Sequence, residues 1–258
     1  MLDPREGVSA TGAIITGASR ERIPDGYSDV LDAATTQISA AAPRASVYVY
    51  GSVATGTAAA PGSDVDLLTV GVPTELAASI SSSLSTDFSD LCRGVEIASA
   101  AESDFTGATD EAYGNRVFLH HYCVRLVGPE IDRAGSPFPA DLHAARGFNG
   151  DIAQHLDRWR RRCAPTDPAL LGRIAARKTL LAVAGLVSVN DTTWTTDRTR
   201  AADRWGEVRA DLAGDLRELL DWTSRRANAT SDRITHHLDS TIEEIVNQFE
   251  ADIGLWPT

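Results

Sequence analysis

The sequence has little of what marks several large classes of protein. Its 258 residues include three cysteines (Cys92, Cys123 and Cys163), an odd number with wide spacing that fits neither a disulfide framework nor a zinc motif. We interpret them as buried thiols. No stretch approaches the roughly 18 apolar residues of a membrane-spanning helix, and the first residues lack the basic and apolar segments of a signal peptide. These absences predict a cytoplasmic protein with no membrane contact.

The chain also has little positive charge. Lysine and arginine total 24 against 36 aspartate and glutamate residues, a net charge of −12, and Lys178 is the one lysine. Because proteins that bind duplex nucleic acid carry a basic footprint, we expect no such partner. Residues 1–137 carry 8 basic and 18 acidic side chains, whereas residues 138–258 carry 16 and 18. This balance favours a small or cationic substrate.

The rest of the composition, 43% hydrophobic and 23% charged, is typical of a globular protein, and the length suits two domains. In the front half, strand-like alternation and helical spacing follow one another, which predicts a small mixed sheet in an α/β (α+β) domain, residues 1–137. We expect helices over 26–42, 73–91 and 110–121, strands over 46–50, 64–72, 94–100 and 123–128, and a loop of small residues over 51–63.

After about residue 139 the apolar spacing becomes helical and stays so, which predicts an all-helical second domain, residues 138–258. We expect a helix around 140–162 and another from the cap pair Asp167-Pro168 to Val189. Steps of three or four residues continue over 205–219 and over 234–249, the latter after Ser231 as a cap. Because the link between the halves is short, we expect the ligand site in a cleft between them.

The residues that point to chemistry are acidic and lie on the expected strands. Asp64 and Asp66 are two apart, so on a strand they project from one face while Val65 and Leu67 enter the core. Two carboxylates held this close repel each other unless a cation lies between them. Oxygen ligands with no histidine or cysteine nearby favour Mg²⁺ or Mn²⁺ over zinc.

Two further features complete the pattern. Glu96 lies between Val95 and Ile97 on the third strand, so it faces the side of the aspartates if its neighbours enter the core. Three carboxylates can hold two metal ions, or hold one and leave an oxygen to accept a proton. The pair Gly51-Ser52, directly after a strand, offers a close backbone approach and a hydroxyl, which suit the oxygens of a polyphosphate. Together these features predict a nucleotide site.

This pattern resembles the nucleotidyltransferases of the DNA polymerase β superfamily, in which a Gly-Ser pair precedes Asp-x-Asp on the next strand and a third acid follows on a later strand. Gly51, Ser52, Asp64, Asp66 and Glu96 match it in order. The segment YGSVATGTAAAPGSDVDLL with a helical tail is most similar to the streptomycin/spectinomycin adenylyltransferases. Thr55 departs from the pattern, because many relatives carry a basic residue there.

The resemblance implies an antibiotic-resistance activity, the transfer of AMP from ATP to an aminoglycoside with release of pyrophosphate. It implies that Asp64, Asp66 and Glu96 bind Mg²⁺, that Glu96 can also act as general base, and that Gly51 and Ser52 hold the phosphates. The tail is similar at Ala176-Arg177-Lys178, at Thr195-Thr196-Asp197 and over 201–205.

Three residues of the back half are further candidates. Lys178 follows Ile174 by four residues and precedes Leu181 by three, so the three residues share one face of the expected helix. If that face is turned inward, Lys178 is placed to bind a triphosphate; otherwise it is a surface lysine. Trp194 and Asp197 could stack on and pair with a cationic acceptor, and ordinary loop packing explains them equally well.

We expect a nucleoside triphosphate and a small-molecule acceptor as partners and a monomer or homodimer. Two alternatives remain: a toxin or regulator that nucleotidylates a protein or an RNA end, and a non-catalytic, antitoxin-like nucleotide-binding module. The acidic balance disfavours the first and the three acids disfavour the second.

Overall fold

The computed structural model describes residues 6–131, 135–162, 167–224 and 229–257. It divides into two compact units, one formed mainly by Ile15–Pro137 and the other by Gly7–Ile14 with Phe138–Thr258. Two short strands near the start of the chain, β1 (Gly7–Val8) and β2 (Ile14–Ile15), pair with each other. None of the helices in the described ranges combines the length and the apolar character that crossing a membrane requires.

The first unit is built on a four-stranded sheet with the strand order β5-β4-β3-β6. β3 (Ser46–Tyr50) pairs antiparallel with both β4 (Val65–Val70) and β6 (Val124–Val127), whereas β4 pairs parallel with β5 (Val95–Ala100). The small mixed sheet of an α/β domain is confirmed, and each strand lies within the range expected from its alternating residues.

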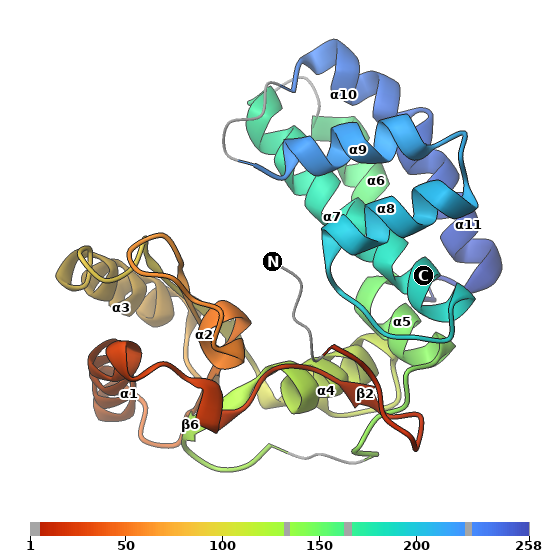
Figure 1. Cartoon of the computed structure of the whole chain (residues 1–258). Helices are drawn as coiled ribbons and strands as arrows, with labels where there is room; N and C mark the ends of the chain where they lie inside the picture. The colour runs from red at the N-terminus through yellow and green to blue at the C-terminus, as the bar shows by residue number, and fades with distance from the viewer. Residues whose placement is uncertain (1–5, 132–134, 163–166, 225–228, 258) are drawn as a thin grey trace. The chain divides into compact units, whose positions relative to one another are not determined.

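One face of this sheet is covered by two helices. Val65 and Leu67 of β4 are fully buried there and pack with the apolar sides of α1 (Ser28–Ala41) and α3 (Thr74–Asp87). These two helices, which the four-residue spacing of apolar positions predicts, lie side by side (Figure 1). Alternation along β4 therefore turns Asp66 toward the opposite face.

The opposite face carries a second, smaller apolar cluster. Tyr48 and Leu68 pack there with Leu119 of α4 (Asp110–Tyr122). Phe105 joins them from the short 3-10 helix η3 (Glu102–Phe105). Two other 3-10 turns, η1 (Arg20–Arg22) and η2 (Asp25–Tyr27), precede α1.

The small-residue segment after β3 begins with a helix, α2 (Gly51–Thr55), where we expected a loop. Val53 and Ala54 are fully buried in the main core of this unit, so the expected loop was wrong for these residues. The helix ends at Gly56, whose φ of 73° is left-handed and whose N–H bonds back to the helix. Small side chains let the helix lie close to the sheet.

Apart from the Gly7–Ile14 segment that carries β1, the described part of the second unit is helical, as the apolar spacing predicts, and its core surrounds one long helix. α7 (Pro168–Asn190) is buried along much of its length. Asp167 accepts a hydrogen bond from the Ala169 N–H at 3.1 Å, which confirms the predicted cap. Around α7 pack α5 (Leu142–Asn149), α6 (Ile152–Arg162), α8 (Arg198–Val208), α9 (Ala213–Trp222), α10 (Ser231–Leu238) and α11 (Thr241–Asp252) (Figure 1).

Three stretches with continuous helical spacing are each divided into two helices. The clearest break is at Gly150, between α5 and α6, where the Trp256 N–H donates to the Gly150 carbonyl at 2.9 Å. A Cβ at Gly150 would lie 2.2 Å from the Trp256 ring. Similar breaks separate α8 from α9 and α10 from α11. The cap of α10 is Thr230, which accepts from the Arg233 N–H, rather than Ser231 as expected.

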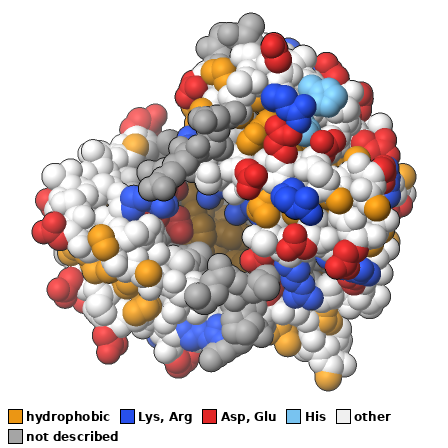
Figure 2. Space-filling model, turned by 45° about the horizontal axis from the view of Figure 1, so that its top comes forward, with side chains coloured by type: hydrophobic (Ala, Val, Ile, Leu, Met, Phe, Trp, Pro, Cys, Tyr) orange, Lys and Arg blue, Asp and Glu red, His pale blue; other side chains and the backbone are white. Residues whose placement is uncertain are grey.

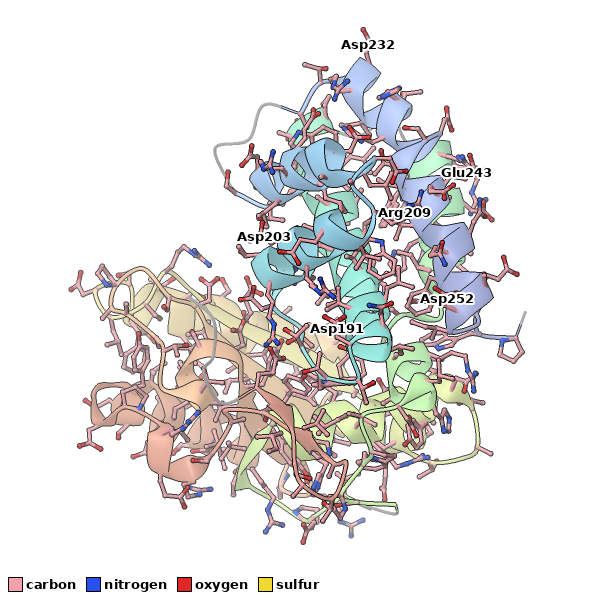
Figure 3. All side chains as sticks on the ribbon, turned by 45° about the vertical axis from the view of Figure 1, so that its right-hand side comes forward. Asp191, Asp203, Arg209, Asp232, Glu243 and Asp252 are labelled. Carbon is pink, nitrogen blue, oxygen red and sulfur yellow. The ribbon has the colours of Figure 1, made fainter. Side chains whose placement is uncertain are left out.

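The near-balanced charge of the second unit is arranged in pairs. Arg160 contacts Asp239 and Glu243, and Arg209 contacts Asp211 and Glu244. Arg209 and Glu243 are labelled in Figure 3, and the face drawn in Figure 2 has acidic and basic side chains interspersed. Cys92 and Cys123, both in the first unit, are buried thiols as expected, and Cys163 lies outside the described residues.

Candidate active site

Three polar side chains form a row across the sheet of the first unit. Tyr50 of β3 lies opposite Asp66 of β4, and Asp66 lies beside Glu96 of β5 in the parallel pair. Residues in register on neighbouring strands project from the same face. Asp66 and Glu96 therefore share one face of the sheet.

Gly51 brings the Gly-Ser pair directly against this row. Its φ is 69°, in the left-handed region that favours glycine. A Cβ at this position would lie 2.5 Å from the Oδ2 atom of Asp66. The close approach of backbone to carboxylate thus requires a residue without a side chain. Ser52 follows in the first turn of α2.

Asp64 is held differently from Asp66. It lies one residue before β4, outside the strand in which we expected it, and its carboxylate is bound by the guanidinium of Arg93. The Arg93 Nε atom is 2.8 Å from Oδ1, and the Nη2 atom contacts Oδ2. Both oxygens of Asp64 are thus occupied by one cation.

The charges of the three acids act on their neighbours. Burial raises the pKa of Tyr50, and the carboxylates of Asp66 and Glu96 add to the rise. The hydrogen bond to Asp64 raises the pKa of Arg93, and the charges of Glu96 and Asp66 raise it further. Arg93 therefore lies within electrostatic reach of all three acids.

The one lysine of the second unit is paired. Lys178 on α7 places its Nζ atom 2.7 Å from Oδ1 of Asp151 and donates to the Phe148 carbonyl at 3.2 Å. The other oxygen of Asp151 is 3.0 Å from Nε2 of His155. Burial raises the pKa of Asp151, but the hydrogen bond from His155 and the charge of Lys178 outweigh it and lower the pKa to about 2. Sequence reasoning missed Asp151, although its four-residue spacing from His155 was a usable signal.

The other candidates of the second unit have structural contacts. Trp194 is 3% exposed and meets Phe148 edge-on at 5.7 Å between ring centroids. Asp197 is the cap of α8 and accepts from the Arg200 N–H at 2.7 Å. These contacts account for both residues within this unit, and their contact with an acceptor stays a prediction.

The comparisons with known proteins bear on the first unit. Residues 33–132 match the family model described as a nucleotidyltransferase domain. This segment is therefore similar to nucleotidyltransferase domains. It contains every acid of the predicted motif and the Gly-Ser pair. None of the curated proteins compared with the chain matches it.

A solved structure extends the likeness beyond this domain. It is the crystal structure of spectinomycin adenyltransferase AAD(9) from Enterococcus faecialis with ATP and spectinomycin. The match covers 86% of this chain and 98% of that chain, with a TM-score of 0.50 and 10% identity. At this identity the match shows a shared fold, an α/β domain with a small mixed sheet followed by a helical region.

The acidic side chains of the first unit form a donor set that fits a hard divalent cation. Asp66 and Glu96 are adjacent carboxylates on one face, Asp64 lies at the start of the same strand, and Gly51 leaves room at the Asp66 oxygen. Oxygen donors of this kind suit Mg²⁺ or Mn²⁺. Thr55, where many relatives are basic, directs its hydroxyl to the Gly51 and Ser52 carbonyls.

A different group of possible metal ligands lies in the second unit. In the described part of the chain, one trio of carboxylate or imidazole side chains has its ligand atoms within 4.8 Å of one another: Asp215, Glu218 and His237. Arg233 pairs with Glu218, and the Thr241 hydroxyl donates to Asp215. This trio is thus already balanced by a cation and hydrogen bonds. Asp64, Asp66 and Glu96 of the first unit do not meet that distance, and the carboxylate of Asp64 is bound by Arg93.

Proposed function

We propose that the chain transfers AMP from ATP to a hydroxyl of a small, cationic acceptor such as an aminoglycoside and releases pyrophosphate. The observation that carries the proposal is the Asp66–Glu96 register beside Gly51, within a nucleotidyltransferase domain. The similar solved structure is that of a spectinomycin adenyltransferase with ATP and spectinomycin, which supports this acceptor class.

The residues of the domain suit the steps of this reaction. Asp66, Glu96 and, once released from Arg93, Asp64 would hold Mg²⁺, which neutralises triphosphate charge when bound. The Gly51 backbone and the Ser52 hydroxyl would hold the phosphate oxygens that leave. Glu96 is exposed, so one of its oxygens can take the proton of the acceptor hydroxyl.

The proposed reaction is an in-line transfer at the α-phosphorus. The acceptor oxygen forms a bond to the α-phosphorus as the bond from that phosphorus to the bridging oxygen of the β-phosphate breaks, and the electron pair leaves with pyrophosphate. The hydroxyl proton goes to Glu96 and then to water. Lys178 stays a predicted triphosphate ligand, and such a role requires it to leave Asp151.

The acidic first half of the sequence supports a cationic acceptor. Residues 1–137 carry ten more acidic than basic side chains. A field of this sign raises the local concentration of a polycation and speeds its encounter with the site. The same field disfavours RNA as the acceptor.

The test is acceptor-dependent pyrophosphate release with ATP and Mg²⁺, using streptomycin, spectinomycin and kanamycin, with mass spectrometry of the drug. Asp66→Asn and Glu96→Gln should each lose activity by at least about 100-fold. Glu75→Gln, an exposed acid of α3 on the same unit, is the matched control and should keep it.

Other results would favour the alternatives. Label that appears on protein or RNA, with no dependence on the drugs, would indicate a toxin or regulator. ATP binding without turnover on any acceptor would indicate a non-catalytic nucleotide-binding module. Unchanged turnover in Asp66→Asn would overturn the assignment of the site itself.

A further inference from the structure

Backbone hydrogen bonds hold Arg93 and Asp64 next to each other, so their ion pair does not depend on the side chains alone. The Arg93 N–H donates to the Ser63 carbonyl at 3.0 Å, and the Val65 N–H donates to the Gly94 carbonyl at 2.9 Å. These two bonds extend the parallel pairing of β4 and β5 beyond the strand ends. They hold Arg93 beside Asp64 at the same edge of the sheet as Glu96.

The pair occupies both carboxylate oxygens of Asp64. The Arg93 side chain is 44% exposed and that of Asp64 is 14% exposed, so the guanidinium can move into solvent while the carboxylate stays in the site. A divalent ion bound by Asp64 needs at least one of these oxygens. Two cations at one carboxylate also repel each other.

We propose that Arg93 is the internal counter-cation of the three acids, that it holds Asp64 until a divalent metal binds, and that metal binding releases it. Arg93 is then a positioning residue that competes with the metal and lowers its affinity. The inference rests on the proposed metal site of Asp64, Asp66 and Glu96, and it adds a control of that site by a residue outside the predicted motif.

The chain offers a matched control for this arginine. Arg204 binds Asp191, labelled in Figure 3, through Nε at 2.7 Å and Nη2 at 3.0 Å. Its side chain is 41% exposed, close to that of Arg93. Arg204→Gln therefore makes the same change in charge and breaks the same kind of bidentate pair in the second unit, together with the contact of Arg204 to Glu207.

The first measurement is Mn²⁺ affinity of the full chain by calorimetry, without nucleotide. Arg93→Gln should bind Mn²⁺ about tenfold more tightly than the wild type, the order expected when one unit charge is removed from beside the ion near a surface. Arg93→Lys keeps the charge without the bidentate fork and should lie between the two. Arg204→Gln should equal the wild type.

The second measurement follows the arginine itself. The side-chain Nε–Hε resonance of Arg93, assigned by its loss in Arg93→Gln, should shift when Mg²⁺ saturates the wild type, and that of Arg204 should not. Equal Mn²⁺ affinity in Arg93→Gln and wild type, or an unmoved Arg93 resonance, overturns the inference.

These outcomes can be told apart from failure of the proposed function. If the wild type binds Mn²⁺ and Asp66→Asn does not, the metal site stands and the arginine variants alone decide the inference. If Asp66→Asn binds Mn²⁺ as the wild type does, or neither binds it, the proposed metal site is wrong and the inference falls with it.

Discussion

Gly51→Ala separates the backbone requirement of the site from general stability. Gly51 has a φ of 69°, and an added Cβ would lie 2.5 Å from Oδ2 of Asp66. That contact is about 1 Å inside the ordinary van der Waals separation, so the carboxylate has to move. The left-handed conformation adds about 1–2 kcal/mol for a residue with a side chain.

The expected loss of activity in Gly51→Ala follows from the displacement of the Asp66 carboxylate. A shift of about 1 Å in a group that positions the reacting atoms lowers the rate by roughly 100-fold. We therefore expect Gly51→Ala to lose roughly 100-fold in turnover. Separately, the left-handed backbone conformation should cost the variant about 1–2 kcal/mol of unfolding free energy. The contact adds to this loss unless Asp66 turns away. Urea unfolding followed by circular dichroism and acceptor-dependent pyrophosphate release measure the two effects separately.

Gly107→Ala is the matched control. Gly107 lies in the same unit and has a φ of 94°, but a Cβ there meets nothing within 4 Å. It should show the conformational cost alone, with normal activity and Mn²⁺ binding. If Gly51→Ala also keeps normal Mn²⁺ binding and turnover, the argument that Asp66 requires a glycine at position 51 is refuted.

Two further predictions concern stability. Burial and, to a smaller extent, the charge of His120 lower the pKa of His121 to about 4. Below pH ~6.5 the unfolded chain therefore binds a proton that the folded chain does not. As a result, the free energy of unfolding falls as the pH is lowered toward 4. His121→Gln should remove about 1–2 kcal/mol of the fall between pH 7 and pH 5, and an identical pH profile by urea unfolding would contradict this. Asp167→Ala removes the acceptor of the Ala169 N–H at the start of α7 and should cost about 1 kcal/mol. Asp167→Asn should keep most of this stability, and equal melting temperatures for all three proteins would show that the cap contributes nothing.

The strands and acids of the first unit could be predicted because their signals are local. Alternation of buried and polar residues over 65–70 gives both the strand and the direction of Asp66. The same alternation around Glu96 gives its side of the sheet. The register that makes the two residues direct neighbours depends on the parallel pairing of β4 with β5, which the sequence pattern does not contain.

The errors arose where contacts distant in sequence decide local structure. Gly150 ends α5 because residues near the end of the chain pack against it, more than 100 positions away. Val53 and Ala54 pack as core residues because a sheet lies beneath them. Periodicity within a window reports which residues face inward, but it does not report what they meet.

Arg93 explains how three carboxylates can share an edge of a small sheet before any metal is bound. Like charges at adjacent register positions destabilise a sheet. The guanidinium of Arg93, whose backbone N–H donates to the Ser63 carbonyl next to Asp64, offsets that repulsion within the fold. The cost of this arrangement falls on metal binding, because the ion has to replace a cation that the chain already supplies. If the proposed metal site is correct, folding and metal loading are thus coupled through one arginine that lies outside the predicted motif.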